Sequence, residues 1–240
     1  MILPTDKDPM GKAISDYYET GKAAQLVVLS TMFDDDEMPV DHLFRTEAKM
    51  NRMERMALKL AKGKVLDVGA GSGCHTLPLQ KRGIDVTAID VSPLSVATQK
   101  QRGVEKALLA DFFEDDFGSN FDTILMLMNG LGICGKVANL PRLFHRWSAL
   151  LAPGGCVIAD SSDLCYIYEE EEGIIDLTGV EGYYGEVDFQ MKYGSILGNR
   201  FDWLYVDFDT LSAMASSYGF ECEILCEGAN NDYLVKITRK

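Results

Sequence analysis

A glycine-rich bend, Gly69-Ala70-Gly71-Ser72-Gly73, most constrains how this chain folds. It follows a short buried-strand pattern over residues 64–68 and precedes a pattern that predicts a helix through Leu77 and Leu79. Glycine lacks a Cβ atom, so the bend lets a ligand approach the backbone, and the helix that starts there offers unpaired N–H groups. Several kinds of nucleotide-binding sheet contain such a bend, so by itself it does not identify the ligand.

The rest of the chain alternates short apolar runs with helical patterns, which is typical of parallel βαβ units. Ser92-Pro93 predicts a helix start, and Pro153-Gly154-Gly155 predicts the end of the helix over residues 140–151. A hairpin pattern closes the chain. We therefore expect an α/β fold with seven strands, of which the last is antiparallel. The strand-like runs are residues 64–68, 84–89, 107–109, 123–128, 156–159, 220–226 and 233–238.

Acidic residues end the first three of these strands. Asp67 lies in the first, Asp90 closes the second and Asp111 closes the third, where Phe112 follows it. Because the carboxyl ends of parallel strands meet at one edge of a sheet, these acids point to one ligand crevice. An acid in the place of Asp90 accepts ribose hydroxyls in dinucleotide folds. We expect Asp111 beside an adenine amino group and the ring of Phe112 near the adenine face.

Five motifs in order resemble those of class I S-adenosylmethionine-dependent methyltransferases. The run VLDVGAGSG resembles motif I of that family, and four later runs resemble its next strands and the loop before the fifth. The resemblance covers about residues 63–160, and the terminal helix and hairpin extend it to the end of the chain. It implies a Rossmann-like fold. The matching runs are residues 65–73, 89–92, 109–112, 121–124 and 150–155.

The resemblance also implies a set of residues around S-adenosylmethionine. The glycines of the bend would line the methionine moiety, Asp90 would hold the ribose, and Asn129 would face the methyl group. Arg45 either pairs with the cofactor's carboxylate or is a surface arginine. The implied cofactor-binding residues are Arg45, Asp67, Gly69, Ala70, Gly71, Gly73, Asp90, Val91, Asp111, Phe112, Met128 and Asn129.

No residue is predicted firmly to act in catalysis. Methyl transfer mainly requires alignment of donor and acceptor, and a base is needed only when the acceptor arrives protonated. The candidates are Asn129, Asp163, Tyr184 and Glu186. Asp163 follows the fifth strand and is a candidate base. Tyr184 and Glu186 either line an acceptor pocket or belong to an aromatic hairpin packed on the sheet.

Two segments fall outside the alternating pattern and are predicted to cap the strand ends. We expect an N-terminal cap segment over residues 1–62 and a methyltransferase domain over residues 63–240, which carries a substrate-cap insertion over residues 161–208. The insertion contains eleven acidic and two basic residues before Asp209, including the run 169–172. That run is either a solvated loop or part of a lid whose field favours a cationic substrate.

Composition restricts the partners. The net charge of −14 argues against nucleic acid, because duplex binding depends on cations placed against phosphates. Six cysteines without a C-x-x-C pair, and only three histidines, form no zinc pattern, so we expect no metal. The start of the chain does not resemble a signal peptide, and no apolar run is long enough to span a membrane. We therefore expect a cytoplasmic protein with a small-molecule substrate.

Two other functions stay open. One is a nicotinamide-dependent oxidoreductase, against which Cys74 argues, because Gly or Ala is expected at that position of G-x-G-x-x-G. The other is a non-catalytic module that senses S-adenosylmethionine or binds a partner. The main hypothesis is an S-adenosylmethionine-dependent methyltransferase that acts on a small molecule.

Overall fold

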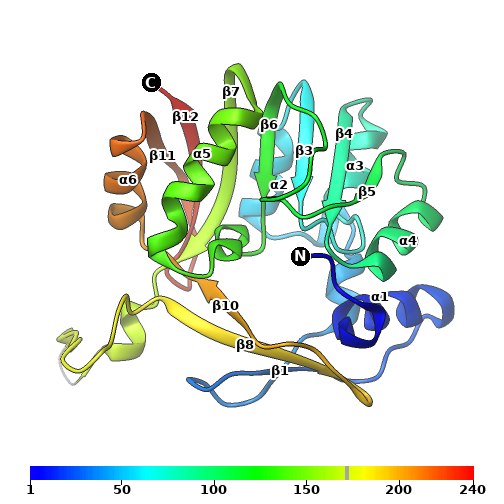
Figure 1. The fold of residues 1–240 in the computed structure, drawn as a ribbon, viewed down its shortest axis with the longest axis horizontal. Coiled ribbons are helices and arrows are strands. Elements are labelled where there is room, and N and C mark those ends of the chain that lie inside the picture. The colour runs from blue at the N-terminus through cyan, green and yellow to red at the C-terminus, as the bar shows by residue number, and fades with distance from the viewer. Residues whose placement is uncertain (171–172) are drawn as a thin grey trace.

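The computed structural model describes residues 1–170 and 173–240, so Glu171 and Glu172 of the acidic run lie outside the described residues. Its main feature is a seven-stranded sheet in the order β11-β12-β7-β6-β3-β4-β5 (Figure 1). The strands are β3 (Lys64–Val68), β4 (Asp85–Asp90), β5 (Ala107–Leu109), β6 (Phe121–Met126), β7 (Leu151–Ser162), β11 (Phe220–Glu227) and β12 (Asp232–Arg239).

Only β12 runs against its neighbours in this sheet. The pairs β3–β4, β3–β6, β4–β5 and β6–β7 are parallel, whereas β12 is antiparallel to both β7 and β11. The predicted α/β fold with an antiparallel last strand is confirmed. The central parallel strands β3 and β6 are buried on both faces, which explains their continuous apolar sequence, whereas two of the three residues of the edge strand β5 are exposed.

The fifth strand is longer than its sequence pattern predicts. Pro153-Gly154-Gly155 was expected to end a helix before a strand at residues 156–159, but β7 already begins at Leu151 and continues to Ser162. Its pairing with β6 shifts register between Phe121 and Thr123, so the extra residues form an irregularity in the ladder. Proline is tolerated at such positions because the local ladder hydrogen bonds are already interrupted.

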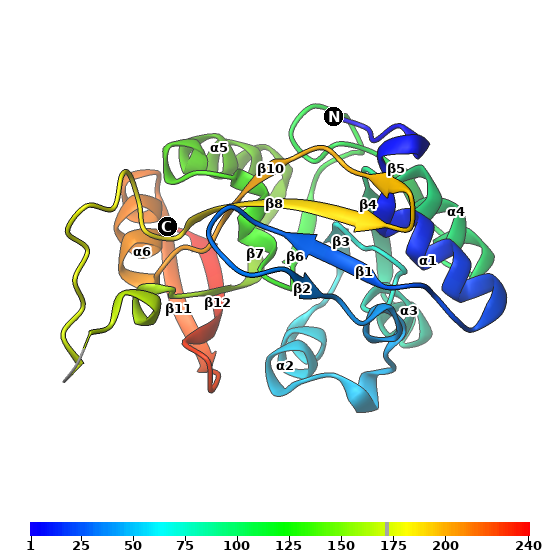
Figure 2. The ribbon, with the colours of Figure 1, turned by 90° about the horizontal axis from the view of Figure 1, so that it is seen from below.

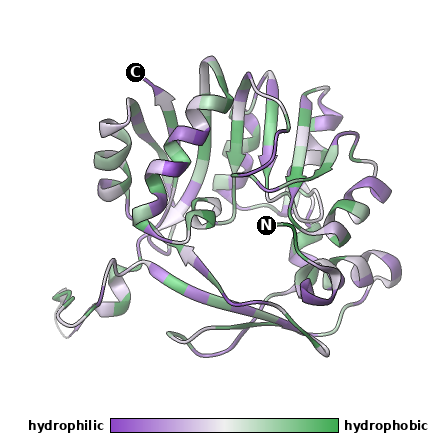
Figure 3. Ribbon diagram, viewed as in Figure 1, coloured by the Kyte–Doolittle hydropathy of each residue, from purple (hydrophilic) through white to green (hydrophobic). Residues whose placement is uncertain are grey.

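Helices cover both faces of the main sheet. One apolar cluster joins the sheet to α5 and α6, and a second cluster joins its other face to α2 and α3. Figure 3 shows the central strands of the main sheet mostly in green, whereas α5 alternates between green and purple. The helices are α1 (Pro9–Thr20), α2 (Arg52–Leu60), α3 (Thr76–Lys81), α4 (Pro93–Gln101), α5 (Leu140–Leu150) and α6 (Phe208–Ser217).

A second sheet lies across the ends of the parallel strands (Figures 1 and 2). Its order is β10-β8-β1-β2, with β9 paired to β8. The N-terminal segment supplies two strands and the later segment supplies three. We call this the cap sheet. Its strands are β1 (Leu26–Leu29), β2 (Asp36–Glu37), β8 (Glu186–Tyr193), β9 (Ile196–Leu197) and β10 (Phe201–Leu204).

The pairing of β1 with β8 joins residues that are far apart in the sequence, because Leu26 and Tyr193 are separated by 167 positions (193 − 26). Leu26 pairs with Tyr193 and Leu29 with Gln190 in an antiparallel register. The predicted boundaries of the cap segments stay a prediction, although β7 extends the core sheet to Ser162. In the part of the chain that the structure describes, no helix is long and apolar enough to cross a membrane.

Candidate active site

The glycine bend leaves β3 with three glycines in the left-handed region. Gly69 has φ of 67°, Gly71 of 56° and Gly73 of 84°. A Cβ atom at Gly69 would meet nothing within 4 Å, so the backbone there faces open space. A Cβ at Gly73 would lie 3.0 Å from Val104 Cγ2, so Gly73 allows packing rather than ligand approach. The backbone of the bend is therefore accessible to a ligand at Gly69, whereas at Gly73 it is covered by Val104.

The Asp90 carboxylate faces this bend. Its Oδ2 accepts a hydrogen bond from the Gly71 N–H at 2.8 Å, and its Oδ1 accepts one from the Ser92 N–H at 2.9 Å. Burial raises the pKa of Asp90 to about 6, although these backbone hydrogen bonds act in the opposite direction. The carbonyl oxygen of the next residue, Val91, accepts the Leu3 N–H at 2.9 Å, so the start of the chain lies beside this strand end.

Asp111 and Phe112 follow β5, and the ring of Phe112 is buried. It is 5% exposed and belongs to the core cluster, where its centroid lies 5.1 Å from that of Phe113. Asp111 Oδ1 accepts the Phe113 N–H at 2.8 Å, and its Oδ2 pairs with the amino group of Met1. The Phe112 side chain packs in the core, and the expected contact between its ring and adenine stays a prediction.

Asp67 is an internal residue. Only 2% of it is exposed, and its Oδ2 accepts a hydrogen bond from Thr76 Oγ1 at 2.5 Å. Thr76 is the first residue of α3, so the carboxylate fastens the start of this helix to β3. Ala70, which is also buried, donates its N–H to the Ile89 carbonyl at 3.1 Å. Asp67 and Ala70 therefore stabilise the bend through hydrogen bonds to other buried parts of the protein.

Arg45 belongs to a buried ionic cluster. It is 5% exposed, so the surface-arginine alternative is wrong. Its Nε donates to Glu54 Oε1 at 2.9 Å, and its Nη1 donates to the His42 carbonyl at 2.6 Å. His75 Nε2 lies 2.7 Å from the same Glu54 oxygen. Arg45 and His75 therefore share one carboxylate beside the glycine bend.

The charges in this cluster stabilise one another. Burial by itself raises the pKa of Glu54, but hydrogen bonds from His75 and Arg45 lower it to about 2. Burial lowers the pKa of His75, but the neighbouring Cys74, and after it Glu54 and Asp67, raise it to about 10. Sequence reasoning missed Glu54. Its only signal is the capping-box spacing from Asn51, whose side chain accepts the Glu54 N–H at 2.8 Å.

A strained turn follows β6. Met128 and Asn129 have backbone φ angles of 64° and 54°, which residues other than glycine rarely adopt. Asp160 of β7 accepts the Asn129 N–H at 3.0 Å, and Ser162 donates its hydroxyl to Asn129 Oδ1 at 3.0 Å. Two consecutive left-handed residues cost of order 1–3 kcal/mol each and persist only when their surroundings hold them.

Asp160 was also missed by sequence reasoning. It is 8% exposed, and burial raises its pKa to about 7. A polar residue directly after the apolar run 156–159 is a possible signal, but that run gave no reason to choose it over Ser161 or Asp163. Its contact with Asn129 depends on how β6 and β7 pair.

The remaining catalytic candidates lie between β7 and the cap. Tyr184 donates its hydroxyl to Asp163 Oδ1 at 2.8 Å, so these two are hydrogen-bonded. Burial raises the pKa of Tyr184, and the bond to Asp163 adds to that shift. Glu186 is turned elsewhere, because its Oε1 accepts the Val137 N–H at 3.0 Å. The structure therefore joins Asp163 to Tyr184 and separates Glu186 from both.

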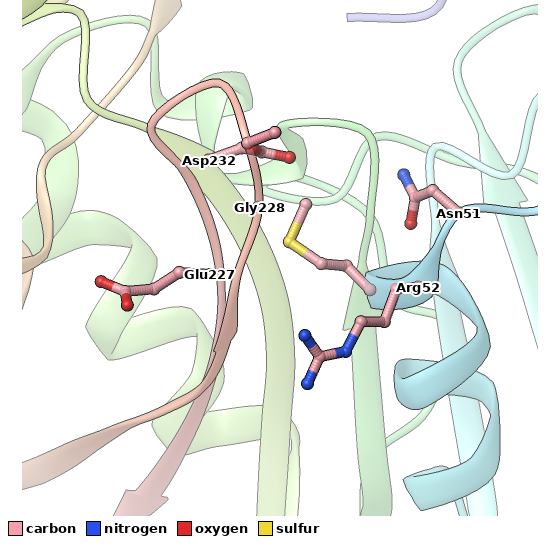
Figure 4. A pocket seen from close by; sticks show the side chains of 7 residues that line it. Asn51, Arg52, Glu227, Gly228 and Asp232 are labelled. Atoms are coloured by element: carbon pink, nitrogen blue, oxygen red, sulfur yellow. The ribbon is translucent and has the colours of Figure 1, made fainter.

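A pocket of about 500 Å³ opens between the start of α2 and the β11–β12 hairpin (Figure 4). The residues that line it are Asn51, Arg52, Met53, Glu227, Gly228, Ala229 and Asp232. None of the predicted cofactor or catalytic residues is among them, so this hollow is separate from the candidate site.

Comparisons with known proteins identify the family. A model described as "Methyltransferase domain" matches residues 65–155. A solved SAM-dependent methyltransferase from Bacteroides fragilis, in complex with S-adenosyl-L-homocysteine, is 52% identical. The match covers 100% of this chain and 98% of that one, with a TM-score of 0.94. The chain belongs to the S-adenosylmethionine-dependent methyltransferases.

Curated relatives match this methyltransferase over shorter stretches. A ubiquinone biosynthesis O-methyltransferase from Nitrobacter winogradskyi is 30% identical over 47% of this chain and 44% of its own length. The cypemycin N-terminal methyltransferase from Streptomyces sp. is 28% identical over 41% and 42%. The matched region is thus less than half of each relative. These matches give the nicotinamide-dependent oxidoreductase and the non-catalytic module no support.

Proposed function

We propose that this methyltransferase transfers a methyl group from S-adenosylmethionine to a small-molecule acceptor. The observation that carries the proposal is the open backbone at Gly69 beside the Asp90 carboxylate. The two lie at the carboxyl ends of β3 and β4, where open α/β sheets bind ligands. The net charge of −14 supports a small-molecule acceptor rather than a nucleic acid.

The residues of the site fit the cofactor. We infer that Gly69 and Gly71 approach it with their backbone, that Asp90 accepts its ribose hydroxyls, and that Asp111 and Val91 lie near its base. Arg45 would act on the cofactor's carboxylate through the cluster around Glu54, which carries a net charge of +1 with His75 protonated. Gly73, Ala70 and Asp67 keep the bend in shape.

When bound, S-adenosylmethionine supplies a methyl group already activated on a sulfonium sulfur. The protein's task is therefore alignment, which contributes about 7–11 kcal/mol in well-oriented reactions. We infer that the Met128–Asn129 turn faces the methyl group, and that Asp163 and Tyr184 lie on the acceptor side. Six free thiols also support a reducing compartment such as the cytoplasm.

Calorimetric titration with S-adenosylhomocysteine tests the cofactor site. We expect binding at pH 7.5 and a loss of affinity as pH falls below 6, because Asp90 must be ionised to accept two hydroxyl donors. Coupling to one proton weakens binding by up to about tenfold per pH unit. Asp90→Asn should bind weakly at every pH. Asp232→Asn, outside the site, should behave as the wild type. Absence of binding at millimolar cofactor would reject the proposal.

A further inference from the structure

One face of the cap sheet is rich in aromatic side chains. Phe201 pairs with Phe189 across the sheet, and Trp203 pairs with Val187, so these side chains share a face. The ring centroids of Phe189 and Phe201 lie 6.3 Å apart, and those of Phe189 and Tyr205 are also 6.3 Å apart. This aromatic face therefore continues past the end of β10 to Tyr205.

The aromatic face is turned toward the strained turn after β6. The Trp203 ring packs so closely on the loop after Asn129 that a Cβ at Gly132 would lie 2.0 Å from Trp203 Nε1. Tyr205 follows the end of β10, and its ring contact with Phe189 places it beside the same aromatic face. Burial raises the pKa of Tyr205 to about 12, and the neighbouring Tyr166 and Asp160 add to that shift. The rings and the Asn129 turn thus lie on two sides of one region.

Asp160 brings negative charge to this region. It accepts a backbone N–H from Asn129, but within the described residues no lysine, arginine, histidine or amino terminus forms an ion pair with it. Burial raises the pKa of this carboxylate to about 7, although the charge of His75, which forms no ion pair with it, acts in the opposite direction. A bound cation would therefore favour the ionised form of Asp160. The Tyr205 side chain is half-buried. The Asp160 carboxylate and the Tyr205 ring are therefore the two groups that a ligand in this region would meet.

We propose that the acceptor is an amine, recognised as a cation between the aromatic face of the cap sheet and the Asp160 carboxylate. The proposal rests on the proposed function and names its substrate class. Aromatic faces attract cations through the ring quadrupole, and a cation compensates a buried carboxylate. The eleven acids and two bases of the insertion produce a field of the same sign. An anionic acceptor such as a phenolate would be repelled.

Binding of two isosteric probes tests this inference. Choline carries a quaternary ammonium group, and 3,3-dimethyl-1-butanol has the same shape without the charge. Both are titrated into the protein saturated with S-adenosylhomocysteine and followed by ligand-observed NMR. We expect choline to bind at least about tenfold more tightly, because only the charged probe is attracted by the aromatic faces and by the Asp160 carboxylate. Equal binding of the two probes, or binding of neither, would overturn the inference.

Variants locate the binding site for the cation. Asp160→Asn and Tyr205→Leu should each weaken choline binding about fivefold or more, since each removes one of the two attractions. Asp202→Asn is the control, because Asp202 is exposed and pairs with Lys136 at 3.8 Å. S-adenosylhomocysteine affinity is measured for every variant. If the wild type binds S-adenosylhomocysteine but does not prefer choline to its neutral isostere, the amine inference fails and the proposed function stands. If the wild type does not bind S-adenosylhomocysteine, the proposed function itself fails.

Discussion

At the scale of single residues, the site contains a buried ionic cluster of Arg45, Glu54 and His75. Glu54 joins Arg45 to His75 within hydrogen-bond distance, and its side chain is 4% exposed. A buried ion pair contributes little compared with apolar packing, but removing one partner leaves the others uncompensated. The cluster therefore makes the region under the glycine bend sensitive to the loss of a single carboxylate.

We predict that Glu54→Gln destabilises the protein by about 3–5 kcal/mol at pH 7, as measured by urea denaturation. Because the folded protein lowers the pKa of Glu54 to about 2 from 4.5, its stabilising effect is present above pH 4.5 and is lost as pH falls toward 2. The wild type and the variant should therefore converge in acid.

Glu47→Gln is the matched control for that substitution. Glu47 pairs with Arg82, but the two side chains are 39% and 36% exposed. A pair in water contributes at most about 1 kcal/mol. A loss at Glu47 as large as that at Glu54 would contradict the importance of burial.

At the scale of elements, the cap sheet is attached to the core through a glycine. η4 (Gly130–Cys134) follows the strained turn, and Trp203 of β10 covers its Gly132. Gly132 does not need a left-handed backbone. A side chain is excluded there only because the indole occupies its place. The small residue thus sets how closely the cap approaches the Asn129 turn.

We predict that Gly132→Ala destabilises the protein by about 1–3 kcal/mol through overpacking. Amide exchange should increase in β8 and β10 and stay unchanged in β3 and β4, as followed by mass spectrometry. Adding Trp203→Leu should make the alanine less costly, because the atoms that clash are removed. A double variant that loses as much as the two single variants together would argue against this contact.

At the scale of the whole molecule, two distant segments form one sheet. β1 pairs with β8 over four residues in register, from Leu26–Tyr193 to Leu29–Gln190. The N-terminal segment supplies only the two strands β1 and β2, and an isolated two-stranded hairpin is marginally stable at best, so it depends on pairing with β8. We therefore expect the cap sheet to open and close as one cooperative unit.

Val28→Pro tests this unit. Val28 pairs with Met191 on one side and Asp36 on the other, so proline there interrupts a central strand. We predict that amide exchange rises in β8 as well as in β1, while β4 and β6 stay protected. Glu37→Pro, in the edge strand β2, should have a smaller effect. Unchanged exchange in β8 would show that the segments open independently.

The sequence by itself determined the class of the fold and the family, because both depend on local patterns. Alternation of apolar runs and helices predicts a parallel sheet, and the glycine bend with Asp90 follows from where strands end. The terminal hairpin is equally local. These features can be predicted from residues that are close together in the sequence, without knowing which distant segments are in contact.

The tertiary structure alone decided which residues touch across long separations. The Phe112 ring points into the core, Glu54 lies between Arg45 and His75, and Asp160 holds Asn129. Each contact depends on strand order, register or helix placement, and polar side chains at neighbouring positions give no preference for one of them. The pairing of β1 with β8 is the same case at larger scale, since a strand pattern shows that a partner is needed but not which one.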